Sequence, residues 1–174
     1  MAGALIVTAM LGAQDLARLD GLRRAHFPPE RNFLKAHLTM FHAIPPSCED
    51  ELSALLKSLA GKFRKPEASL SEVMSLGRGV AFRVRSDELG EIRAIIADHF
   101  HGALSAQDSQ GWRPHITVQN KVDPKVAKAL KSELEREFEP HPLEIAGLAV
   151  HRYMDGPWEP LGRFSFRGAR GPLR

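Results

Sequence analysis

The sequence predicts one α+β domain built from two similar halves. Apolar residues recur with strand or helix spacing in the order strand, helix, strand, helix, two strands, and then helix, strand, helix, two strands. No polar linker or low-complexity segment separates the halves, and 174 residues is an ordinary size for one domain. We therefore expect residues 1–174 to form a single bilobal domain with a cleft between its lobes.

The first half begins with an apolar run and continues with amphipathic helices. Leu16, Leu19 and Leu22 follow one another at helical spacing, and prolines at 45 and 46 close the second strand. The short segment Gly77-Arg78-Gly79 is typical of a hairpin. The expected elements are a strand at 4–11, a helix at 14–24, a strand at 36–41, a helix that opens at Ser47 or Glu49 and ends at Gly61, and strands at 69–76 and 80–85.

The second half repeats this order. A helix starts at Asp87, with Leu89, Ile92, Ile95 and Ile96 expected to face inward, and a strand follows at 114–118. Asp123-Pro124 opens another helix, whose apolar face is expected to hold Val126, Leu130, Leu134 and Phe138. Strands at 143–153 and 159–166 surround a turn at Asp155-Gly156-Pro157.

Composition and charge narrow the functional class. A net charge of +3 suits an anionic ligand in a local pocket, but the chain lacks the dense basic tracts of a duplex-binding surface. Cys48 is the only cysteine, which excludes an internal disulfide and fits a reducing compartment. The apolar start is too short to span a bilayer. We expect a cytoplasmic monomer without a membrane anchor.

Two short His-x-Thr segments are the main functional signal. The chain has eight histidines and only the threonines Thr8, Thr39 and Thr117. Two of these lie two positions after a histidine, at His37 and His115, whereas random placement gives about 0.1 to 0.2 such pairs. Residues i and i+2 of a strand share one face, so each segment presents an imidazole beside a hydroxyl.

This pair of segments fits the cleavage of a phosphodiester. The reaction needs a base for the attacking oxygen and an acid for the leaving oxygen, in line through phosphorus. Two imidazoles can supply both, because their pKa lies near neutrality, and threonine hydroxyls can donate to the charged phosphate oxygens. His37, Thr39, His115 and Thr117 are therefore the predicted catalytic residues, and the arrangement requires no metal or cofactor.

The sequence around both segments resembles the 2H phosphoesterase superfamily, and within it the 2′-5′ RNA ligase-like branch. The resemblance rests on residues 36–45 (AHLTMFHAIP), residues 112–118 (WRPHITV) and the closing Gly-Pro-Trp-Glu at 156–159. It implies a bilobal fold with two antiparallel sheets and outer helices around a central cleft. It also implies that the two histidines act as acid and base, and that the two threonines bind phosphate.

The implied substrates are RNA ends or small nucleotides with a 2′,3′-cyclic phosphate or a 2′-5′ linkage, with RNA ligation as the reverse reaction. The chain departs from its relatives after each motif. Some have Phe-Leu-Gly where it has Phe41-His42-Ala43, and some have an arginine where it has Gln119-Asn120-Lys121. Lys121 is a candidate to replace that arginine, although lysine lacks its bidentate fork.

Further residues are candidates for substrate binding. Arg152 and Tyr153 could hold a phosphate and a base, and Trp112 and Arg113 could line the cleft, although a solvated surface or packing under a loop explains them equally well. A zinc site is a competing interpretation of the histidines, but neither motif has close Cys, His or carboxylate neighbours. The motifs could also be ordinary half-exposed strand positions, where threonine is common.

The remaining histidines divide into two groups. We interpret His42, on the strand face opposite His37, and His99 and His101, at a helix end, as structural. His26, His141 and His151 stay unassigned. The sequence thus predicts a metal-independent cyclic phosphodiesterase, with a nucleotide-binding module of little or no turnover as the alternative.

Overall fold

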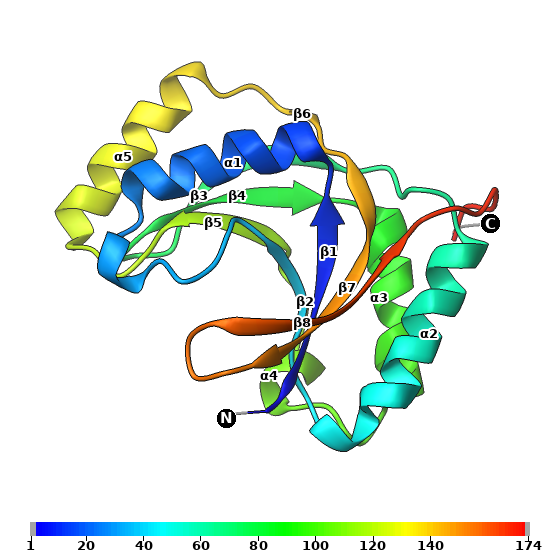
Figure 1. The fold of residues 1–174 in the computed structure, drawn as a ribbon. Coiled ribbons are helices and arrows are strands. Elements are labelled where there is room, and N and C mark those ends of the chain that lie inside the picture. Colours follow the sequence, from blue (N-terminus) through cyan, green and yellow to red (C-terminus); the bar gives the residue numbers. More distant parts are fainter. Residues whose placement is uncertain (1–2, 173–174) are drawn as a thin grey trace.

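The computed structural model describes residues 3–172 and contains the expected helices and strands in the expected order, together with a short helix (α4) and a short strand (β6) that were not expected (Figure 1). The α-helices are α1 (Ala13–His26), α2 (Glu49–Lys62), α3 (Asp87–His99), α4 (Ala106–Ser109) and α5 (Pro124–Glu137), and single 3-10 turns lie at Pro29–Arg31 and Pro46–Cys48. The strands are β1 (Leu5–Leu11), β2 (Leu38–Ile44), β3 (Ser69–Ser75), β4 (Val80–Arg85), β5 (His115–Gln119), β6 (His141–Pro142), β7 (Ile145–Tyr153) and β8 (Trp158–Ser165).

The strands form an eight-stranded sheet in the order β6-β3-β4-β5-β2-β1-β7-β8, and every neighbouring pair is antiparallel. The α+β class with antiparallel strands is thereby confirmed. The two sheets that we expected are the two halves of this sheet, joined between β5 and β2 by the single register pair Leu38 and Ile116. The two motif strands are thus neighbours at the junction of the halves.

Helices cover the sheet on two sides of this junction. In Figure 1, α1 and α5 lie across β3, β4 and β5, whereas α2 and α3 lie on the side of β1 and β7. α1 contacts β5, α5 contacts β3 and β4, and α2 contacts β7 and β8. None of the helices in residues 3–172 is long and apolar enough to cross a membrane.

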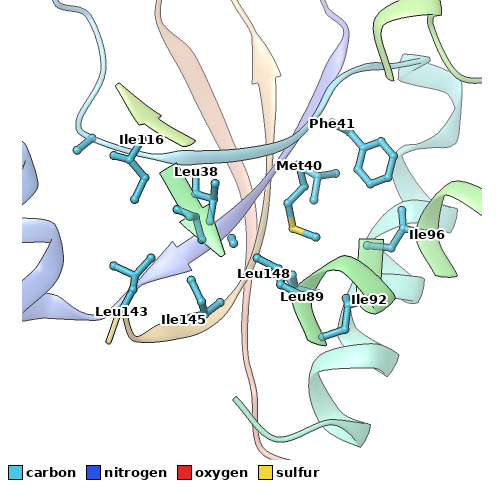
Figure 2. Close-up of a cluster of buried hydrophobic side chains, with 14 of the residues drawn as sticks. Leu38, Met40, Phe41, Leu89, Ile92, Ile96, Ile116, Leu143, Ile145 and Leu148 are labelled. Carbon is cyan, nitrogen blue, oxygen red and sulfur yellow. The ribbon is translucent and has the colours of Figure 1, made fainter. Parts of the chain in front are cut away.

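The apolar core lies directly beneath the motif strands. Leu38 and Ile116, the central residues of the two His-x-Thr segments, are fully buried and lie near one another in the core (Figure 2). Met40 and Leu148 continue this cluster toward Ile92 and Ile96 of α3. Close packing of this kind leaves little free volume, so the backbone that carries the motif side chains is held firmly.

Two predicted helix faces differ from the observed ones. Ile95 and Val126, expected to face inward, are 37% and 51% exposed. Each lies next to a residue that is fully or nearly fully buried, Ile96 and Ala127 respectively. A stripe of about 100° on each helix is enough to pack on the sheet, so an apolar residue at its margin is left outside.

Candidate active site

The four predicted catalytic residues line one cavity of about 430 Å³. His37 lies directly before β2, Thr39 near its start, and His115 and Thr117 at the start of β5, and all four are half-buried. The cavity is completed by residues from α3, the segment around α4 and the start of β8. These additional lining residues are His42, Arg93, Gln107, Asp108, Gln110, Gly111, Trp112, Arg113 and Trp158.

The antiparallel pairing of β2 and β5 sets the arrangement of the motifs. Leu38 faces Ile116 across the strands and both point into the core. The flanking residues of an antiparallel pair oppose one another on the other face, so each histidine lies beside the threonine of the other motif. The result is a pseudo-twofold site with one imidazole at each side.

Both imidazoles are held in the same way by the backbone. Nδ1 of His37 donates to the carbonyl of Lys35 at 2.8 Å, and Nδ1 of His115 donates to the carbonyl of Arg113 at 2.7 Å. A carbonyl oxygen only accepts, so Nδ1 carries the proton in each ring. Nε2 is therefore the nitrogen left to exchange a proton with a ligand, as acid–base catalysis requires.

The surroundings of His37 favour its neutral form. Its pKa is lowered from 6.5 to about 4, mainly by burial and also by the positive charges of Arg23, His151 and His115, against the opposing effect of the bond to Lys35. The ring of Trp158 covers the imidazole edge to face, with centroids 4.7 Å apart. At neutral pH His37 is thus a proton acceptor.

A second cavity of about 500 Å³ meets the first at His37 and Trp158. It is mostly apolar, with Met10, Leu11 and Leu16 among its lining residues. His151 lies in it, hydrogen-bonded at 3.0 Å to Thr8 and 5.3 Å from the Trp158 ring centroid. Burial lowers the pKa of His151, and the charge of Arg163 adds to this effect. His37 therefore stands between two cavities.

His42 corrects our interpretation from the sequence. It was expected on the strand face opposite His37, but it lines the same cavity. The reason is a bulge: Val7 and Thr8 of β1 pair with Phe41 and Thr39 of β2, so β2 has one extra residue over this stretch. Met40 and Phe41 are both buried as a result, and the alternation of faces is broken before His42.

Asp108 of α4 holds this bulge and was not found from the sequence. It is 2% exposed, and its carboxylate accepts from the backbone N–H of His42 at 2.8 Å and of Ala43 at 2.9 Å, and from Nδ1 of His42 at 3.2 Å. These bonds lower the pKa of Asp108 against the opposing effect of burial, which is larger than any one of them. Asp108 is therefore a buried carboxylate with its donors in place.

Arg93 of α3 is a further cavity residue without a signal in the sequence. Its Nε donates to the carbonyl of Met40 and its Nη2 to the carbonyl of Asp108, each at 2.9 Å. The guanidinium lies 4.5 Å from the Phe41 ring centroid and 5.3 Å from that of Trp112. Burial lowers the pKa of Arg93. These contacts fix the plane of the guanidinium at the cavity wall.

The five substrate-binding candidates separate into two groups. Trp112 and Arg113 line the cavity, and Nε1 of Trp112 also donates to the carbonyl of Thr39 at 3.1 Å. Arg152, Tyr153 and Lys121 line neither cavity. Arg152 forms ion pairs with Glu49 and Glu159, so its positive charge is already compensated by two carboxylates. Lys121 is exposed beyond the end of β5, where it does not replace a cavity arginine.

Within residues 3–172, no group of three or more His, Cys, Asp or Glu side chains is placed to hold a metal ion. The arginines of the cavity and its histidines are instead suited to an anion. The arrangement can accept a proton at one side of a bound phosphate and donate one at the other.

Comparison with solved structures gives the same fold. TT0787 of Thermus thermophilus aligns with a TM-score of 0.66 and 17% identity, over 96% of this chain and 100% of that one. E. coli LigT complexed with NADP+ aligns with a TM-score of 0.58 and 18% identity, over 95% of this chain and 99% of that one. LigT complexed with 3′-AMP aligns with a TM-score of 0.58 and 16% identity, over the same shares of the two chains. No curated protein matches the sequence.

The family model of the 2′-5′ RNA ligase superfamily matches residues 12–157, which include both His-x-Thr motifs. This stretch covers most of the chain and runs from α1 to the turn between β7 and β8. The protein therefore belongs to the 2′-5′ RNA ligase superfamily, a family of 2H phosphoesterases.

Proposed function

We propose that the protein is a metal-independent phosphodiesterase that opens 2′,3′-cyclic phosphates on RNA ends or nucleotides. The observation that carries this proposal is the pair of imidazoles in one cavity, each with Nδ1 bonded to a carbonyl and Nε2 left for proton transfer. A site that only binds nucleotides would not need two matched proton-transfer groups.

The reaction is a single displacement at phosphorus. Nε2 of neutral His37 accepts a proton from water as the water oxygen bonds to phosphorus. The bond from phosphorus to the 3′ oxygen breaks, and His115, which enters the step as the imidazolium and keeps Nδ1–H on the carbonyl of Arg113, donates its Nε2 proton to that oxygen. The product is a 2′-phosphate, and the lowered pKa of His37 is the reason for making it the base.

The threonines stabilise the negative charge that develops on the phosphate oxygens during this step. Hydroxyls of Thr39 and Thr117 line the cavity with the two imidazoles and donate to the non-bridging oxygens. They are fixed by the packing of Leu38 and Ile116 beneath them. Donors set in place before the reaction stabilise the transition state without having to reorganise.

The two cavities that meet at His37 and Trp158 leave room for more than the phosphate group. Both ester bonds of a 2′,3′-cyclic phosphate go to one ribose, so the second cavity is available for the nucleoside attached to it. The mostly apolar cavity beyond His37 suits a nucleobase, which can stack on Trp158. The complexes of LigT with NADP+, ATP and 3′-AMP support nucleotides as the ligand class.

Ligation follows from the same geometry. A ribose 5′-hydroxyl in place of water would lose its proton to His37 and bond to phosphorus, while the 3′ oxygen leaves with the proton of His115. The product is a 2′-5′ linkage, and no further reactant is needed. Hydrolysis and ligation then compete for one cyclic phosphate.

The test is turnover of nucleoside 2′,3′-cyclic monophosphates and of oligonucleotides with the same terminus, in the presence of EDTA. We expect a 2′-phosphate product, and loss of activity by at least about a hundredfold in His37→Ala and His115→Ala. His101→Gln, an exposed histidine outside both cavities, is the control. Binding without turnover would instead indicate a nucleotide-binding module, and loss of activity with EDTA would refute the metal-free reaction.

A further inference from the structure

Two arginines line the cavity of the catalytic pair in addition to its histidines. Arg93, Arg113 and His42 line it in addition to the two motif histidines. Asp108 is the one carboxylate among its lining residues, and that carboxylate is already engaged by the backbone and ring of His42. A phosphodiester carries a single negative charge. The two guanidinium groups therefore point to a second anionic group on the ligand.

His42 is oriented for this purpose by Asp108. Its Nδ1 donates to the carboxylate at 3.2 Å, so Nε2 is the free ring nitrogen. The side chain of His42 is 44% exposed, whereas that of Asp108 is 1% exposed. The carboxylate is thus enclosed and the imidazole opens to the cavity. Asp108 fixes the direction of Nε2 at the cavity wall, and when the ring carries both protons it donates Nδ1–H to Asp108 and Nε2–H to an anion.

Arg93 is oriented at the same wall. Within residues 3–172 its bonds to the carbonyls of Met40 and Asp108 engage Nε and Nη2 and leave Nη1 for a ligand. The carbonyl of Asp108 accepts a hydrogen bond from Arg93, and its carboxylate accepts one from His42. One buried residue thus orients both the guanidinium and the imidazole. Sharing one anchor keeps the imidazole and the guanidinium at a constant separation.

We propose that His42 and Arg93 form a second phosphate site, which binds the phosphate on the 5′ side of the ribose whose 2′,3′ end reacts. The inference rests on the proposed function, since that function places the reacting phosphate between His37 and His115. The 5′ phosphate is present in an RNA end and absent from a nucleoside cyclic monophosphate. The site therefore selects RNA ends over the smaller nucleotides.

The departure from the family pattern after the second motif agrees with this site. In place of an arginine the chain has Gln119, which is 3% exposed, followed by Asn120 and Lys121, and none of the three lines the cavity. The cavity instead receives a guanidinium from α3 and an imidazole from the bulge in β2. The extra anion site is thus supplied by segments other than the one in which the arginine is missing.

Binding of product-like nucleotides tests the site without depending on turnover. The probes are adenosine 2′-monophosphate and adenosine 2′,5′-bisphosphate, which differ only in the 5′ phosphate, and calorimetry gives both dissociation constants. We expect the protein to bind the bisphosphate about tenfold or more tightly, as two charge-assisted hydrogen bonds allow. In His42→Asn this ratio should fall to about two or below. The ratio, and not either affinity alone, is the readout.

Controls keep the result specific to this site. His101→Gln removes an exposed histidine outside the cavity and should leave the ratio as in the parent protein. Arg93→Gln should lower the ratio as His42→Asn does, and circular dichroism of both variants verifies the fold. Equal affinities for the two probes in the parent protein would overturn the second site, and so would an unchanged ratio in both variants.

The two proposals fail in different ways. If the bisphosphate preference is present but cyclic phosphates are not opened, hydrolysis is refuted and the second site stands. If cyclic phosphates are opened but the preference is absent, the second site is refuted and hydrolysis stands. If the protein binds neither probe, the second site is refuted, and the turnover assay alone decides on hydrolysis.

Discussion

Replacing Trp158 with alanine tests whether enclosure makes His37 a base. Lowering the pKa from 6.5 to about 4 corresponds to roughly 3.4 kcal/mol in favour of the neutral imidazole, at about 1.36 kcal/mol per pH unit. The Trp158 ring, 4.7 Å from the imidazole, is one of the groups that exclude water. Its removal should raise the pKa of His37 by about one unit, or ~1.4 kcal/mol.

The assay is the pH dependence of kcat/KM for a nucleoside 2′,3′-cyclic monophosphate. His37 must be neutral in the free enzyme, so activity persists above its pKa and is lost as the pH falls through about 4. In Trp158→Ala the acid limb of the profile should move upward, toward about pH 5. Because the variant also loses a cavity wall, the midpoint of the limb and not the absolute rate is compared.

A control and an independent measurement complete this test. Met154→Ala removes an exposed apolar side chain just before the β7–β8 turn, outside both cavities, and should leave the midpoint in place. The imidazole proton resonance of His37 gives its pKa directly by NMR titration. A value near the ordinary 6.5 in the parent protein, or a midpoint that does not respond to the loss of Trp158, would refute the assignment of His37 as the base.

Three further predictions concern the motifs and their support. Thr117→Val should lower kcat by about a hundredfold with little change in the melting temperature, because a phosphate donor is lost; a rate within about twofold of the parent enzyme would contradict this. Ile116→Ala should lower the free energy of unfolding by about 2 to 5 kcal/mol in urea denaturation, since the side chain is fully buried; a loss under about 1 kcal/mol would show that the core collapses around it. Asp108→Asn should cost about 3 kcal/mol in the same measurement, because an amide group faces the donors of His42 and Ala43; an unchanged midpoint would exclude the bulge contact.

Local pattern was enough to find the two His-x-Thr motifs. The scarcity of threonine made the two His-x-Thr pairs stand out, and strand alternation predicted correctly that Leu38 and Ile116 are buried. It also predicted that each histidine shares a face with its threonine, and all four side chains line one cavity. These relations involve neighbours two positions apart, so they survive small errors in the strand boundaries.

The rest of the cavity depends on contacts between distant segments. Arg93 belongs to a helix whose pattern predicted only its buried face, and Asp108 belongs to α4, which has four residues and no periodic signal. His42 was misplaced because the bulge in β2 is set by its pairing with β1 and not by its own sequence. Arg152 was proposed as a phosphate ligand from its charge alone, and the sequence does not show that it forms ion pairs with Glu49 and Glu159.

The symmetry of the motifs and the asymmetry of their surroundings have different consequences. Equivalent bonds from Nδ1 to the carbonyls of Lys35 and Arg113 make the two imidazoles interchangeable as acid and base. Their neighbours remove this equivalence, because Trp158 and the charge of Arg23 act on His37 and favour its neutral form. In the proposed reaction, the direction of proton transfer is thus set by residues outside both motifs. Changing the direction would require changes to those residues, while His37 and His115 stay as they are.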